Sequence, residues 1–213
     1  MTEYIISNNI NELEAGVDEC ARGSLIYDVV AACVVMPFKY NDTKYLEIKD
    51  SKKLSAKKRN ELAMYIKNTA ITYGIGTASC DEIDEINILQ ATYKAMHRAI
   101  NEAYKKHPFN NLKIDGPNFK SYIPPGIDSE PMMHECIIKG DSKYLSIAAA
   151  SIIAKDYHDN KIKELVEQNP ELEKYGLLDN QGYGTVKHRI AIKEYGVTKW
   201  HRKTFGSVKE FIY

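Results

Sequence analysis

Four carboxylates stand beside glycines or at the ends of apolar segments, a pattern that suits divalent-metal chemistry. They are Asp18, Glu19, Asp115 and Asp141. Hard divalent ions prefer carboxylate oxygens, and magnesium takes only one or two of them, which leaves room for substrate phosphate oxygens. Two such ions about 3.5 to 4 Å apart can activate a water and stabilise the leaving oxygen of an in-line phosphodiester displacement. The four residues therefore form a candidate site for metal-dependent phosphotransfer.

Each of these acids also has an ordinary structural interpretation. The adjacent pair Asp18 and Glu19 is common in proteins and usually lies on a solvated turn. An Asp-Gly step such as the one at Asp115 is typical of a turn, and Asp141 could simply cap the helix predicted after it. Asp18 stands out, because its apolar neighbours place it in a central strand, where an ionised side chain needs a partner or a metal.

The elements that must position these acids follow from hydrophobic periodicity and from turn and cap residues. Strands are predicted at 15–20, 28–36, 70–77, 112–115 and 135–138, and helices at 55–67, 85–105, 146–166 and 185–194. The run 28–36 (DVVAACVVM) is almost continuously apolar, as in a strand buried on both faces. The small-residue stretch 148–154 (AAASIIA) allows a helix to pack closely on a sheet. The predicted class is α/β, a central mixed sheet flanked by helices.

Bulk composition excludes several classes of protein. The chain has 213 residues with 44% hydrophobic and 27% charged content, as expected for one globular domain spanning 1–213. No apolar run approaches the roughly 18 residues of a membrane span, and the N-terminal residues lack the features of a secretory signal. The four cysteines are scattered, which predicts neither a zinc site nor a disulfide framework. A cytoplasmic monomer is the expectation.

The net charge is +0, so attraction to nucleic acid would have to come from local patches. Two runs of cationic side chains are candidates. Each run alone is more typical of a solvated face than of a phosphate site, and its position relative to the acids must decide. They comprise Lys52, Lys53, Lys57, Lys58 and Arg59 in the first run, and Lys199, His201, Arg202 and Lys203 in the second.

Seven blocks in the right order resemble the ribonuclease HII family over nearly the whole chain, from Ala15 to about Val208. The first strand block, AGVDECARG, holds the Asp-Glu pair, and a later block joins Lys-Gly-Asp-Ser-Lys to the small-residue helix. The seven blocks are residues 15–23, 50–55, 86–92, 114–116, 139–155, 182–185 and 201–205. So many ordered matches are very improbable by chance.

The resemblance implies a ribonuclease-H-like fold whose C-terminal helical part, from about residue 160, helps to hold the duplex. It implies that Asp18, Glu19, Asp115 and Asp141 are the metal-binding catalytic acids, with Mg²⁺ or Mn²⁺ as cofactor. The implied substrates are RNA/DNA hybrids and DNA duplexes that contain ribonucleotides. Cleavage would fall in the RNA strand, and on the 5′ side of an embedded ribonucleotide, leaving 3′-hydroxyl and 5′-phosphate ends.

The resemblance also implies a set of substrate-binding residues: Ala21, Arg22, Gly23, Lys52, Lys143 and Tyr183. In the family a Gly-Arg-Gly backbone approaches the 2′-hydroxyl, the group that distinguishes RNA from DNA. Here Ala21 replaces the first glycine, which would be harmless if φ is negative at that position and could weaken discrimination otherwise. Tyr183 matches the tyrosine that packs on the sugar beside the RNA-to-DNA junction. The lysines, together with Arg22, His201 and Arg202, are placed near substrate phosphates, although His201 and Arg202 are as readily structural.

Three alternatives remain open from the sequence. Ribonuclease HIII shares much of the core but usually carries an additional N-terminal substrate-binding domain, whereas about a dozen residues precede the first block here. A nucleic-acid-binding module of the same fold with weakened catalysis is conceivable because of Ala21, although all four acids are retained. Another nuclease of the ribonuclease-H-like superfamily would share the acids but lack the Lys-Gly-Asp and Gly-Tyr-Gly blocks.

Overall fold

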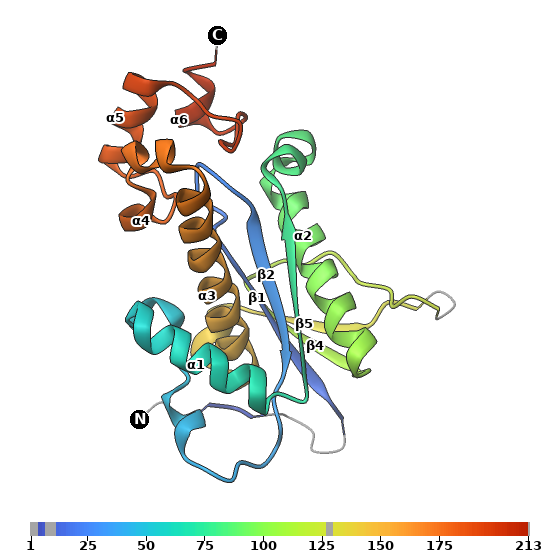
Figure 1. Ribbon diagram of the computed structural model, residues 1–213. Helices are drawn as coiled ribbons and strands as arrows, with labels where there is room; N and C mark the ends of the chain where they lie inside the picture. The colour runs from blue at the N-terminus through green and yellow to red at the C-terminus, as the bar shows by residue number, and fades with distance from the viewer. Residues whose placement is uncertain (1–3, 7–11, 127–129, 213) are drawn as a thin grey trace.

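A five-stranded mixed sheet forms the centre of the molecule (Figure 1). The computed structural model describes residues 4–6, 12–126 and 130–212. The strands are β1 (Glu14–Cys20), β2 (Val29–Val35), β3 (Thr72–Ala78), β4 (Asn111–Asp115) and β5 (Met133–Ile137), in the order β3-β2-β1-β4-β5. β1, β2 and β3 are joined antiparallel, whereas β4 and β5 run parallel to β1. The predicted mixed sheet is confirmed, and β1 is its central strand.

Helices cover both faces of this sheet. The helices are α1 (Ala56–Thr69), α2 (Cys80–Lys106), α3 (Leu145–Gln168), α4 (Leu177–Asn180), α5 (Val186–Tyr195) and α6 (Gly206–Lys209). Figure 1 shows α2 on one face, α1 and α3 on the other, and α4 to α6 gathered at one end of α3. Among the described residues, none of these helices is both long and apolar enough to cross a bilayer.

The contact between β1 and α3 is unusually close, and it is the N-terminal half of α3 that lies along β1. An added Cβ at Gly16 would lie 2.2 Å from the carbonyl carbon of Ser146, so no larger residue fits there. Ala148, Ala149 and Ala150 are fully buried in the same region of α3. The small residues of both elements thus let the helix backbone rest directly on the strand, as the sequence predicted for this stretch.

Helix α2 begins five residues before the predicted start, because a capping box defines its N-terminus. The Ser79 hydroxyl accepts a hydrogen bond from the Glu82 backbone, and the Glu82 side chain accepts one from the Ser79 backbone. The helix is interrupted at Asn87, whose φ is 67°. The Asn87 side chain accepts hydrogen bonds from the backbones of Leu89 and Gln90, and so caps the segment that follows.

The C-terminal helices enclose an apolar cluster of their own. Ile162 and Leu165 of α3, Tyr175, and Ile192 of α5 belong to it, and Leu25 reaches into it from the connection between β1 and β2. That connection carries the Ala-Arg-Gly segment. The C-terminal part is therefore packed against the segment that follows the first two acids.

Candidate active site

All four predicted acids line one cavity, of about 490 Å³, at the C-terminal ends of β1 and β4. The parallel pairing of Val17 with Ile114 places Asp18 beside Asp115, since each is the next residue along its strand. Asp141 follows β5 in a short 3₁₀ turn, Gly140–Ser142. The other lining residues are Cys20, Ala21, Arg22, Gly23, Ser51, Lys52, Ser151, Lys155 and Tyr183. Strand order thus brings together acids that lie far apart in the sequence.

The electrostatics of this cavity disfavour negative charge in the absence of cations. Burial raises the pKa of Asp18 well above its usual range, and repulsion from Glu19 and Asp115 adds to the rise. Burial also raises the pKa of Glu19, although the Arg22 guanidinium partly opposes that shift. The pKa of Asp141 is raised by burial and by the charges of Asp115 and Asp50. A bound cation would relieve this repulsion.

Backbone and hydroxyl groups fix the orientation of the carboxylates. Asp18 Oδ1 accepts a hydrogen bond of 2.7 Å from the Glu19 backbone, and the Ser151 hydroxyl also hydrogen-bonds Asp18. Asp115 Oδ1 accepts a bond of 2.7 Å from the backbone N–H of Gly140. An added Cβ at Gly140 would lie 3.2 Å from that oxygen and 2.6 Å from the Ile147 side chain, so glycine allows this approach. Asp141 does not act as the side-chain cap of α3.

The donor set fits divalent cations that share their coordination with substrate. Within the described ranges, no group of three or more His, Cys, Asp or Glu side chains is arranged to hold one ion. Magnesium needs only one or two carboxylates when phosphate and water supply the remaining oxygens. In the part of the chain that the structure describes, Arg22 is the one cation that forms an ion pair with these acids, at 3.2 Å from Glu19. Three carboxylates thus remain for added cations.

The turn after β1 presents the Ala-Arg-Gly backbone to the cavity in a strained conformation. Ala21 has a φ of 69°, so the condition under which the alanine would be harmless, a negative φ, is not met. Ala21 is 2% exposed and belongs to the buried apolar cluster that includes residues of α3. The alanine in place of the family's glycine therefore adds strain to the backbone at this position.

Replacing Ala21 with glycine tests this strain. Relief of the left-handed conformation is worth about 1 to 2 kcal/mol. Loss of a buried methyl group and the extra freedom of glycine in the unfolded chain together cost a similar amount. We expect the free energy of unfolding to stay within about 1 kcal/mol of wild type. Ala32→Gly is the matched control, because Ala32 is also fully buried but lies in β2.

In the control variant no strain is relieved, so we expect a loss of about 2 kcal/mol. Urea denaturation of both variants measures the difference between the two substitutions. Equal losses at Ala21 and Ala32 would contradict the strain at Ala21.

Arg202 hydrogen-bonds the main chain of the connection between β1 and β2, which includes the Ala-Arg-Gly turn. Its Nη1 donates to the carbonyl of Arg22 at 3.1 Å and its Nε donates to the carbonyl of Tyr27 at 2.8 Å. Arg202 and His201 are both fully buried. Of the two interpretations that the sequence left open for them, phosphate contact or a structural role, the structure supports the structural one, because their hydrogen bonds go to the main chain and to buried side chains.

Tyr183 lies across the turn from Gly23. An added Cβ at Gly23 would lie 3.8 Å from the Tyr183 ring, and the Tyr183 hydroxyl hydrogen-bonds the Ala21 backbone. Lys155 Nζ stands 5.5 Å from the centroid of the Tyr183 ring. The tyrosine and the Ala-Arg-Gly backbone thus form one wall of the cavity.

The two lysines assigned to the substrate occupy different places. Lys52 is exposed and lines the cavity, whereas Lys143 is exposed but does not line it. In the remainder of the first cationic run, Lys58 pairs with Glu47 and Glu61. The structure therefore brings Lys52, but not Lys143, to the four acids.

Three polar residues of the cavity were quoted in the sequence blocks without being assigned a role: Ser51, Ser151 and Lys155. The hydroxyl groups of Ser51 and Ser151 lie 3.0 Å apart. Ser151 and Lys155 are four residues apart on α3, and this helical spacing, which puts them on one face, is the signal that could have found them.

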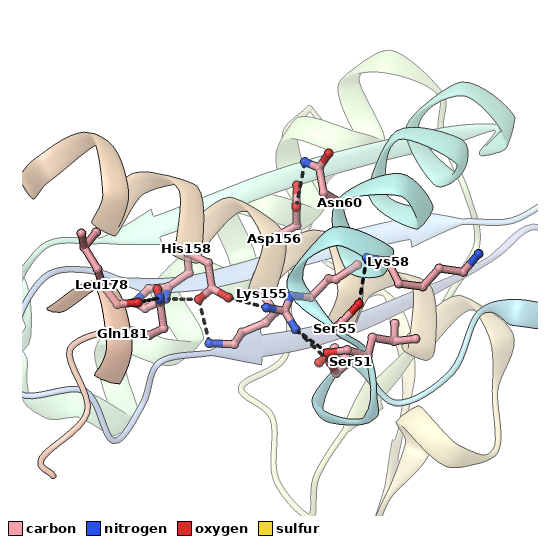
Figure 2. Close-up of polar contacts among 12 residues, drawn as sticks. Ser51, Ser55, Lys58, Asn60, Lys155, Asp156, His158, Leu178 and Gln181 are labelled. Atoms are coloured by element: carbon pink, nitrogen blue, oxygen red, sulfur yellow. Dashed lines mark hydrogen bonds and ion pairs between the residues drawn. The ribbon is translucent and has the colours of Figure 1, made fainter. Parts of the chain in front are cut away.

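A partly buried ionic network holds these residues (Figure 2). Asp159 accepts hydrogen bonds of 2.7 Å from both Lys155 and Arg59. Arg59 also donates to the Ser51 carbonyl at 3.2 Å, so the contacts drawn near Ser51 and Lys155 in Figure 2 belong to one network. Buried cations are stable only when paired in this way. Asp159 therefore connects the Tyr183 wall with the loop that carries Lys52.

Comparisons with known proteins agree with this geometry. The family model for ribonuclease HII matches residues 15–208. A ribonuclease HII from Christiangramia forsetii is 47% identical over 191 residues, which cover 90% of this chain and 89% of the relative. Among solved structures, ribonuclease H2 from Pyrococcus horikoshii superposes with a TM-score of 0.71 at 25% identity, covering 93% of this chain and 96% of that one.

A structure of Bst-RNase HIII in complex with Mn²⁺ has the same fold. Its TM-score is 0.71 at 17% identity, and the match covers 93% of this chain and 68% of that one. The family model and the relative that is nearly half identical both carry the type II name. The chain therefore belongs to the ribonuclease HII family, metal-dependent endoribonucleases that act on RNA/DNA hybrids.

Proposed function

We propose that this protein cuts the RNA strand of RNA/DNA hybrids and also cuts DNA duplexes on the 5′ side of embedded ribonucleotides. The observation that carries the proposal is that Asp18, Glu19, Asp115 and Asp141 share one cavity with Tyr183. Two Mg²⁺ or Mn²⁺ ions, when bound, would supply the activation of water and the stabilisation of the leaving oxygen. The four carboxylates would hold these ions, and the products would carry 3′-hydroxyl and 5′-phosphate ends.

In this proposal, the residues around the four acids recognise the ribose of the substrate and bind its phosphates. The backbone of Ala21, Arg22 and Gly23 faces the 2′-hydroxyl, which is the group that separates RNA from DNA. Tyr183 packs against the deoxyribose on the 3′ side of a single ribonucleotide. Lys52 neutralises a phosphate next to the acids, and Lys143 contacts the duplex outside the cavity.

The C-terminal part of the chain supports substrate binding from outside the sheet. We place the duplex against the helices that follow about residue 160, since their apolar cluster holds the connection between β1 and β2. Organisation of the whole chain as one catalytic domain, action as a monomer and a cytoplasmic location stay predictions from the sequence.

A cleavage assay with three duplexes tests the proposal. One duplex is an RNA/DNA hybrid, one is DNA with a single ribonucleotide, and one is DNA alone. We expect cleavage of the first two in Mg²⁺ or Mn²⁺ and none after chelation. Tight binding without cleavage in either metal would favour the alternative of a nucleic-acid-binding module with weakened catalysis.

A further inference from the structure

Two fully buried histidines lie directly behind the backbone of Tyr183. His188 is in α5, His201 follows α5, and neither side chain is exposed to solvent. His188 Nδ1 lies 3.1 Å from the carbonyl oxygen of Tyr183, and the Nε2 atoms of the two histidines lie 3.2 Å apart. On its other side, His201 Nδ1 lies 3.1 Å from the backbone nitrogen of Thr198 and 2.8 Å from the Thr198 hydroxyl, which can itself donate to this nitrogen.

The direction of these hydrogen bonds is determined by the groups at the two ends. The Thr198 backbone N–H can only donate, so His201 Nδ1 must be an unprotonated acceptor. A neutral His201 then carries its proton on Nε2 and donates to His188 Nε2. His188 in turn must carry its proton on Nδ1, where the Tyr183 carbonyl accepts it. Each neutral ring thus has one defined tautomer.

The surroundings of the pair favour neutral rings. The Tyr175 ring forms T-shaped contacts with both histidines, with centroid distances of 5.1 Å to His201 and 6.0 Å to His188. Burial lowers the pKa of His188, and burial together with repulsion from His188 lowers the pKa of His201 to about 3. A proton added to His188 would sit on Nε2 and oppose the N–H of His201, and a proton added to His201 would sit on Nδ1 and oppose the backbone N–H of Thr198.

We propose that Thr198, His201 and His188 form a directional hydrogen-bond chain that positions Tyr183 for recognition of the ribonucleotide junction. His188 and His201 are positioning residues, since they reach the substrate only through Tyr183. The Tyr183 backbone also pairs with Ser24, and Leu25 N donates to the Gly182 carbonyl at 2.8 Å, so the loop is held from both sides. The inference rests on the proposed function of Tyr183, which is to pack on the deoxyribose on the 3′ side of a single ribonucleotide.

Long-range proton–nitrogen NMR on the full-length protein with ¹⁵N-labelled histidine tests the chain directly. Near pH 7 we expect a neutral His188 protonated on Nδ1 and a neutral His201 protonated on Nε2. Spectra of the His188→Asn and His201→Gln variants assign the two signals. A charged ring, or a His188 protonated on Nε2, would overturn the chain, and this result does not depend on what Tyr183 does to substrate.

A pair of substitutions tests the link to substrate. In His188→Asn the side-chain amide takes the place of Nδ1 and can still donate to the Tyr183 carbonyl. In His188→Gln the amide takes the place of Nε2, and that donor is lost. The quantity measured is the efficiency of cleavage at a single ribonucleotide divided by the efficiency on a long hybrid.

We expect the ratio to fall about tenfold in His188→Gln, as for one buried hydrogen bond left unmade, and to stay near wild type in His188→Asn. His107→Gln, at an exposed histidine that ends α2, is the control and should leave the ratio unchanged. Equal ratios in the Asn and Gln variants would overturn the positioning role. If the His188 tautomer is as expected but Tyr183→Ala leaves the ratio unchanged, the failure lies in the proposed function of Tyr183.

Discussion

Asp18→Asn and Asp141→Asn are each expected to lower cleavage at least about a thousandfold, the equivalent of about 4 kcal/mol of transition-state stabilisation. Each substitution removes a charged oxygen ligand and keeps the size of the side chain. Both carboxylates line the one cavity that holds all four predicted acids. Single-turnover cleavage at saturating Mg²⁺ measures the effect. Turnover close to wild type in either variant would remove that residue from the metal site.

The fold should survive these substitutions, and metal-free Asp18→Asn should be more stable than wild type near neutral pH. Because burial and like charges raise the folded-state pKa of Asp18, its ionisation opposes folding. That cost is absent at pH values below about 4, the ordinary carboxyl pKa, and it grows as the pH rises toward the raised pKa. Melting temperatures of the two proteins should therefore coincide in acid and separate near neutrality.

Tyr183→Ala is expected to lower cleavage at a single embedded ribonucleotide about tenfold more than cleavage within a long hybrid, because packing of a ring on substrate is worth about 1 to 3 kcal/mol. In a duplex with one ribonucleotide, the next sugar on the 3′ side is a deoxyribose, and that sugar is the proposed contact of the Tyr183 ring. The ratio of the two cleavage efficiencies measures the effect independently of any general loss of activity.

Two further variants make this measurement specific. Tyr183→Phe keeps the ring and removes the hydroxyl that hydrogen-bonds the Ala21 backbone, so we expect a ratio close to wild type. Tyr195→Ala removes a half-exposed ring of α5 that does not line the cavity, and should leave the ratio unchanged. A wild-type ratio in Tyr183→Ala would contradict the proposed recognition of the RNA-to-DNA junction by Tyr183. It would not bear on the metal site.

Much of the fold could be predicted because the strands are short and separated by turn residues, and because β2 is apolar and buried throughout. The central position of β1 follows from its neighbours, and parallel pairing with β4 then brings Asp18 beside Asp115. The predicted start of α2 is five residues too late, because the apolar periodicity is clearest further along the helix. The sequence of a capping box, Ser79 with Glu82, marks the true start. The kink at Asn87 depends on its own side chain and carries no periodic signal.

The parts of the site that escaped prediction depend on three-dimensional contacts. The positive φ of Ala21 is imposed by the turn and could not be deduced from an alanine. For His201 and Arg202 the sequence left phosphate contact and a structural role equally open, and only their burial and their hydrogen bonds to main-chain groups and a second histidine decide for the structural role. Lys155 gains its place from Asp159 on the same helix and from the Tyr183 ring.

The central claim is that the cavity of four acids is a metal-dependent centre that cuts beside a ribonucleotide. Mapping both ends of the products from a DNA duplex with one ribonucleotide tests it most directly. We expect one cut, on the 5′ side of the ribonucleotide, with 3′-hydroxyl and 5′-phosphate ends, only when Mg²⁺ or Mn²⁺ is present. Cleavage that persists after chelation, or products that end in a 2′,3′-cyclic phosphate, would contradict the account.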